Sequence, residues 1–63
     1  MKLLKLVAVE AIEVGDILIL GNQRYAVTSI EDEAYGRDFR LKDAFGAGKC
    51  HLVAYGEQVA IEL

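Results

Sequence analysis

The sequence predicts an all-β fold, a small and strongly bent five-stranded barrel formed by residues 1–63 as one domain. Short apolar segments follow one another at intervals of about ten residues, which is the spacing of small barrels and sandwiches. Each segment is bounded by glycine, asparagine or an acidic cluster, and these residues favour turns. A chain this short buries only about 60% of its unfolded surface, so contacts with neighbouring copies would help to complete its core.

The central strands are predicted by their residue patterns. Residues 17–20 are a β-branched run that a glycine–asparagine turn separates from residues 25–30, and we expect these two strands to form a hairpin. Residues 38–42 alternate between charged and apolar side chains. Because successive side chains of a strand point to opposite faces, this alternation places Phe39 and Leu41 inward.

Two further strands are expected near the C-terminus, at residues 50–54 and 59–61, each preceded by a glycine turn. The segment before Gly15 fits two patterns, and its β-branched residues favour an extra N-terminal strand over a short helix. The apolar residues that would share a helix face are Leu3, Leu6, Val7, Ala11 and Val14, whereas Leu4, Leu6 and Ala8 would share a strand face.

Charge and composition limit the classes of function. Seven basic and ten acidic residues give a net charge of −3, and one cysteine cannot form an internal disulfide. Charged residues interrupt the apolar N-terminal stretch before it reaches the roughly 20 residues of a membrane helix. We therefore expect a cytoplasmic protein that does not associate with a membrane. The interrupting charges are Lys5, Glu10, Glu13 and Asp16.

The sequence shows no catalytic or metal-binding pattern, so we expect no enzyme, no metal and no cofactor. Cys50 and His51 are adjacent, but neighbours on a strand point to opposite faces, which predicts a small buried Cys50 and a surface His51. The acidic run at residues 31–33 lacks the spaced ligands of a calcium loop and indicates a solvated loop. An enzyme site assembled across subunits from Cys50 or His51 is a weaker hypothesis.

Positive charge concentrates only in residues 37–49, which does not favour tight duplex binding. Single-stranded RNA is a different case, because a few aromatic or arginine planes can hold its bases. Tyr35, Arg37 and Tyr55 lie in expected loops where such stacking is feasible. Their alternative role is that of ordinary half-buried turn residues.

From Val14 onward the layout resembles the Sm-like (LSm) family. The resemblance rests on a hairpin, an acidic loop containing Asp32, an alternating strand, and a final apolar strand preceded by Gly56. That family usually has arginine before this glycine and asparagine in its first-motif loop, where this chain has Tyr55 and Arg37-Asp38. The resemblance implies an RNA site formed by Tyr35, Arg37, Asp38, Tyr55 and Gly56.

The resemblance also implies a homo-oligomeric ring, in which residues 50–54 of one subunit pair with residues 58–62 of the next. Such a head-to-tail contact satisfies the edge hydrogen bonds of both strands. The implied interface residues are Cys50, Leu52, Ala54, Val59 and Ile61.

Residues 14–27 also resemble the SH3-like N-terminal barrel of elongation factor P, whose corresponding loop carries a basic tip. Here that loop is acidic, and Arg37 stands at its end. This resemblance implies the alternative to a ring, a monomeric SH3-like module that docks on a protein or on the ribosome. The docking surface would be the one bearing Arg40 and Lys42.

Overall fold

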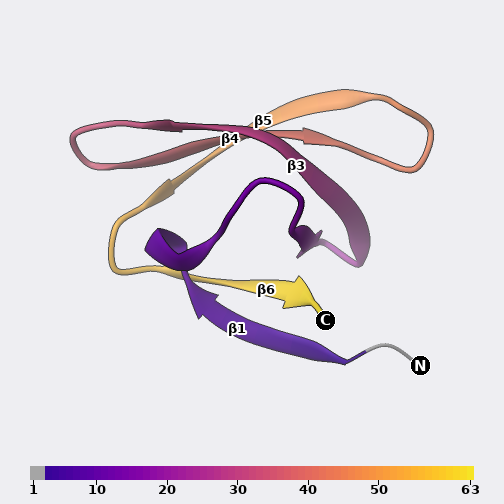
Figure 1. Ribbon diagram of the computed structural model, residues 1–63, viewed down its shortest axis with the longest axis horizontal. Helices are drawn as coiled ribbons and strands as arrows, with labels where there is room; N and C mark the ends of the chain where they lie inside the picture. Colours follow the sequence, from indigo (N-terminus) through magenta and orange to yellow (C-terminus); the bar gives the residue numbers. More distant parts are fainter. Residues whose placement is uncertain (1–2) are drawn as a thin grey trace.

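The computed structural model describes residues 3–63 as a single antiparallel sheet with one short 3-10 helix (Figure 1). The strands are β1 (Leu4–Ala8), β2 (Ile17–Leu20), β3 (Gln23–Asp32), β4 (Gly36–Lys42), β5 (Gly48–Ala54) and β6 (Gln58–Glu62), and the helix is η1 (Val9–Ala11).

The sheet has the strand order β1-β6-β2-β3-β4-β5. Its outermost strands, β1 and β5, do not pair with each other, so the sheet is open rather than closed into a barrel. Figure 1 shows β1 and β6 on one side of the molecule and β4 and β5 on the other. The all-β prediction is confirmed, but the described residues form six strands instead of five.

The additional strand is β1, and the preference for a strand near the N-terminus is confirmed. β1 pairs with β6 along its full length, from Leu4 opposite Glu62 to Ala8 opposite Gln58. The chain then makes the single turn of η1 before it enters β2. No helix within residues 3–63 is long and apolar enough to cross a membrane.

The predicted hairpin is formed by β2 and β3, with Leu20 opposite Gln23. Gly21 and Asn22 connect the strands with φ angles of 56° and 68°. Two positive φ angles in a two-residue connection are typical of a type I′ turn, whose twist matches that of the flanking strands. Glycine and asparagine adopt this conformation at low cost, which explains why the hairpin turns here.

β3 and β4 extend further than the sequence pattern predicts. The ladder continues to Asp32 opposite Arg37, so the expected loop at residues 31–36 shortens to residues 33–35. A bulge interrupts the ladder at Thr28, and the Thr28 hydroxyl donates a hydrogen bond of 3.1 Å to the carbonyl oxygen of Arg40. A bulge of this kind bends a strand and increases its twist.

The core lies on one face of the bent sheet and includes the fully buried Phe39. Phe39 and Leu41 are buried, as their alternation predicts. Gly36 is also required by packing, because a Cβ atom there would lie 2.3 Å from the carbonyl oxygen of Val53. The buried apolar side chains are Val9, Ile12, Leu18, Val27, Phe39, Leu41, Val53 and Val59.

The prediction of a buried Cys50 is wrong. His51 lies opposite Phe39 in the ladder and therefore shares the inner face, where it is half-buried. Cys50 lies opposite Arg40 on the outer face and is exposed. Because the two residues alternate, only one of them can point inward, and the register with β4 selects His51.

Candidate functional site

Most of the residues predicted to bind RNA gather at one end of the sheet, where the β3–β4 turn meets the β5–β6 turn. The backbone N–H of Tyr55 donates to the carbonyl oxygen of Tyr35 at 3.1 Å, which ties these two turns together. A hollow of about 230 Å³ between the turns is lined by Glu10, Asp32, Arg37 and Tyr55. The sequence-based grouping of Tyr35, Arg37 and Tyr55 therefore corresponds to a real neighbourhood.

Arg37 uses its guanidinium group within the fold. Its Nη1 atom donates to the carbonyl oxygens of Val9 at 3.0 Å, Glu10 at 3.2 Å and Ile12 at 3.0 Å, and its Nε atom donates to Asp32 at 2.7 Å. The side chain is only 16% exposed, and its Cζ atom lies 5.8 Å from the centre of the Phe39 ring. Arg37 thus fastens η1 and the following segment to β4.

The alternation of β4 explains the position of Arg37. Arg37, Phe39 and Leu41 occupy every second position and share the inner face of the strand. The pattern that predicts Phe39 and Leu41 inside also places Arg37 beside them. The sequence pattern predicts a strand that begins at Asp38, two residues after the observed start of β4 at Gly36, and it therefore places Arg37 in a loop.

Tyr55 and Gly56 also make contacts within the fold. The Tyr55 hydroxyl donates to the carbonyl oxygen of Glu33 at 2.8 Å, and the backbone N–H of Gly56 donates to a Glu10 carboxylate oxygen at 3.3 Å. Tyr35 remains 64% exposed. Carboxylates of Glu10 and Asp32 border this hollow, and negative charge of this kind repels the phosphates of a nucleic acid.

Asp38 does not join this group. It lies on the opposite face of β4 from Arg37, between Glu31 on β3 and Leu52 on β5. Its side chain is half-buried. The five residues predicted to form an RNA site therefore divide between two faces of the sheet.

The predicted interface residues on β5 lie at the outer edge of the sheet. One backbone hydrogen bond lies at each end of the β4–β5 ladder: Tyr55 N–H donates to Tyr35 at one end, and Asp43 N–H donates to Ala47 at 3.0 Å at the other. These two bonds determine which of the residue pairs between them are hydrogen-bonded. Because such pairs alternate in an antiparallel ladder, the intervening residues of β5 direct their backbone groups away from β4. These residues are Gly48 and the predicted interface residues Cys50, Leu52 and Ala54, and all four are exposed.

The predicted interface residues on β6 occupy a different environment. Val59 is buried in the core, and Ile61 is half-buried against it. β6 has β1 along one side and the end of β2 on the other. The side of β6 that was expected to receive a neighbouring subunit is thus occupied by β1.

The unpaired edge beyond β6 therefore belongs to β1. Hydrogen bonds from Leu63 to Leu3 at 2.9 Å and from Val9 to Glu57 at 3.1 Å bracket the β1–β6 ladder in the same way as those at β5. The alternation then directs the backbone groups of three residues of β1 away from β6. These residues are Leu4, Leu6 and Ala8, and their side chains are exposed.

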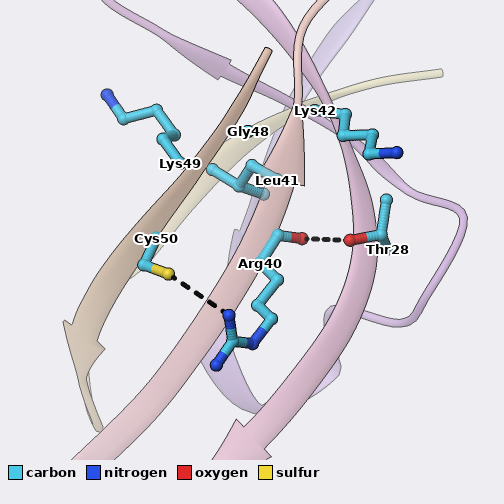
Figure 2. Close-up of a pocket in the computed structure, with 7 residues that line it drawn as sticks. All are labelled: Thr28, Arg40, Leu41, Lys42, Gly48, Lys49 and Cys50. Carbon is cyan, nitrogen blue, oxygen red and sulfur yellow. Dashed lines mark hydrogen bonds between the residues drawn. The ribbon is translucent and has the colours of Figure 1, made fainter. Parts of the chain in front are cut away.

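Basic side chains gather over the outer face of β4 and β5, around a hollow of about 300 Å³ (Figure 2). Arg40 and Lys42 are exposed there, and neither forms an ion pair with any of residues 3–63. Arg40 directs its Nη1 atom toward the sulfur of Cys50 at 3.9 Å. Lys49 extends away from Lys42, and its Nζ atom lies 5.2 Å from the centre of the Tyr25 ring.

Phe45 is a surface feature that the sequence patterns do not predict. It lies in the β4–β5 turn and is 96% exposed. The Asp43 carboxylate accepts hydrogen bonds of 2.9 Å from the backbone N–H groups of both Phe45 and Ala47. An aromatic residue in a short turn that begins with aspartate and contains glycine is the sequence signal that could have identified it.

Residues 3–63 contain no group of three or more histidine, cysteine, aspartate or glutamate side chains arranged to hold a metal ion. Comparisons with protein-family models, curated proteins and solved structures give no match for this chain.

Proposed function

We propose that this protein is a non-catalytic β module that assembles with copies of itself into a homo-oligomeric ring. In this assembly, β5 of each copy pairs with β1 of the next. The observation that carries the proposal is the presence of two unpaired sheet edges of similar chemistry. Each edge presents residues whose backbone groups point outward, Leu4, Leu6 and Ala8 on β1 and Gly48, Cys50, Leu52 and Ala54 on β5.

Neither edge strand contains a proline or a bulge, and each contains a single lysine, Lys5 in β1 and Lys49 in β5. The chain has no proline, and its bulge lies in β3 rather than in an edge strand. Leu4 and Leu6 are 56% and 63% exposed, and Leu52 is 48% exposed. Natural proteins block edges with proline, bulges, charges or a covering segment, and here one lysine per edge stands beside exposed leucines that favour association.

The two edges also lie at opposite ends of the strand order. A contact between two different edges leaves one unpaired edge of each kind on every growing assembly. Only closure into a ring pairs all of them, whereas a two-fold contact between identical edges stops at a dimer and leaves the other edge exposed. A ring is thus the arrangement that satisfies both β1 and β5.

Analytical ultracentrifugation over a wide concentration range tests this proposal, with one variant for each edge. Leu6→Pro removes an outward N–H from β1, and Leu52→Pro removes one from β5, while the ladders to β6 and β4 remain intact. We expect each variant alone to be monomeric and an equimolar mixture to form a heterodimer, because each supplies the edge that the other lacks. A Leu52→Pro variant that still self-associates would indicate β1–β1 pairing instead.

Circular dichroism establishes that the proline variants are folded. Leu6→Lys and Leu52→Lys serve as milder alternatives, since a charge at an edge also opposes pairing. A wild-type protein that is monomeric at every concentration overturns the ring.

The exposed basic residues favour a second candidate function, a monomeric SH3-like module that docks on an anionic partner such as a ribosomal or protein surface. Arg40 and Lys42 support it, because both are exposed on one face without an ion-pair partner among residues 3–63. This candidate requires no assembly. A strictly monomeric protein whose partner binding is lost in an Arg40→Gln, Lys42→Gln double variant would support it over the ring.

A further inference from the structure

The basic face continues along the sheet surface as three adjoining hollows. The first, of about 300 Å³, is lined by Arg40, Lys42 and Cys50 among others. The second, of about 150 Å³, shares Lys42 with the first and adds Arg24. The third, of about 260 Å³, shares Arg24 with the second and ends at Phe45. These hollows form one continuous surface, which we call the basic groove.

The charge of the basic groove is predominantly positive. Arg40, Lys42 and Arg24 line it, and its single carboxylate, Asp43, accepts two backbone hydrogen bonds of the turn. Arg24 forms an ion pair with Glu62, yet its own side chain remains 61% exposed while that of Glu62 is 6% exposed. The rest of the chain is acidic, since the whole molecule carries a net charge of −3. The groove is therefore the local site at which an anionic ligand is favoured.

Phe45 gives the groove a planar apolar end. Its ring is 96% exposed, and the two hydrogen bonds to Asp43 hold the turn that carries it. An exposed ring on a braced turn loses little conformational freedom when a flat group packs against it. The arrangement thus combines a fixed aromatic surface with cations that follow in a line.

The geometry points to the basic groove as a binding site for single-stranded nucleic acid, with a base stacked on Phe45 and the backbone phosphates near Arg24, Lys42 and Arg40. Aromatic stacking combined with a positively charged groove is how proteins hold single strands without reading their sequence. A duplex keeps its bases stacked inside and cannot place one on Phe45. An acidic peptide could satisfy the cations, but it has no repeating planar groups to use the ring.

This inference goes beyond self-assembly and does not depend on it, because a single copy carries the whole groove. Its site also differs from the group of Tyr35, Arg37 and Tyr55, where acidic side chains border the hollow. Binding and sedimentation are separate measurements, so failure of one proposal can be distinguished from failure of the other.

Fluorescence anisotropy with labelled oligouridylate and oligoadenylate of about 12 nucleotides, a length within the range covered by small single-strand-binding domains, tests the inference. We expect Phe45→Leu to weaken binding by about tenfold and Phe45→Trp to retain it, because leucine preserves apolar surface but cannot stack. Lys42→Gln should lower the slope of log affinity against log salt by about 0.7, the value for one phosphate contact of a single strand. Lys5→Gln in the monomeric Leu6→Pro background, where β1 cannot pair with a neighbouring groove, is the charge-matched control and should leave the slope of that variant unchanged.

Four outcomes would overturn the inference. The first two are the absence of binding to either oligonucleotide at low salt and an equal affinity of the wild type and Phe45→Leu. The third is a loss of binding in Tyr35→Ala without any loss of binding in Phe45→Leu. The fourth is a labelled poly-glutamate peptide that binds as tightly as the oligonucleotides or more tightly. Circular dichroism of each variant confirms that lost binding does not reflect unfolding.

Discussion

Replacement of Arg37 by alanine should remove a large part of the stability of this fold. Nη1 of Arg37 donates to three carbonyl oxygens, and two of these belong to Val9 and Ile12, whose side chains are in the core. A hydrogen bond from a charged donor contributes about 1.5–3 kcal/mol, and a buried acceptor left unsatisfied costs about 1–3 kcal/mol. The pair with Asp32 adds at most about 1 kcal/mol, because that carboxylate is 69% exposed.

These contributions overlap, since all three carbonyl oxygens share one nitrogen, and we expect Arg37→Ala to cost about 3 kcal/mol in total. A chain of this length has a free energy of unfolding of only about 3–9 kcal/mol. With a urea dependence of about 1 kcal/mol per molar, the midpoint of urea unfolding should fall by about 3 M, or folding should be lost. The assay is equilibrium urea unfolding followed by far-UV circular dichroism.

Two matched variants separate the contacts of Arg37. Arg37→Lys keeps the charge but cannot reproduce the fork of donors, and we expect a loss of about 1–2 kcal/mol. Asp32→Asn removes only the exposed ion pair and should cost less than about 1 kcal/mol. An Arg37→Ala midpoint within about 0.5 M of the wild type would refute the assignment of Arg37 as a structural fastener.

Three other substitutions test local features by urea unfolding. Gly36→Ala should destabilise the fold by about 3 kcal/mol, because its Cβ would lie 2.3 Å from the Val53 carbonyl oxygen. Gly48→Ala is the control and should be tolerated, because the nearest atom to its Cβ would lie at 3.7 Å. Equal effects of the two substitutions would contradict the steric argument. Thr28→Val should cost about 1 kcal/mol through loss of the hydrogen bond to Arg40, and Thr28→Ser should recover it. Asp43→Ala should cost about 1–2 kcal/mol and increase the backbone mobility of Phe45 in NMR relaxation, and an unchanged turn would count against bracing by Asp43.

Local patterns predicted much of the fold. The glycine–asparagine pair places the β2–β3 turn because both residues tolerate positive φ, and alternation places Phe39 and Leu41 in the core. The prediction of inward and outward residues failed in β5, where the residue pattern of the strand allows either of two neighbouring residues to face the core. Cys50 and His51 are both small enough for a core, and only the register with Phe39 decides that His51 points inward.

The candidate sites were harder to predict, because they depend on contacts between distant residues. Arg37 appeared to be a loop cation, since its acceptors lie 25 to 28 residues earlier in the chain. The side of β6 likewise appeared available until β1 was placed beside it. Phe45 was missed because the exposure of a turn residue depends on the direction of the turn, which the Asp43 hydrogen bonds determine.

The two proposals meet at Cys50. This residue lines the first hollow of the basic groove and also directs its backbone toward the unpaired edge of β5. A neighbouring β1 paired at that edge would form a wall of the first hollow, so assembly should strengthen nucleic-acid binding. We therefore expect the monomeric Leu6→Pro variant to bind oligouridylate more weakly than the wild type and to regain affinity when Leu52→Pro supplies a β1 strand. If the addition of Leu52→Pro forms the heterodimer but leaves the affinity unchanged, then the edge and the groove act independently.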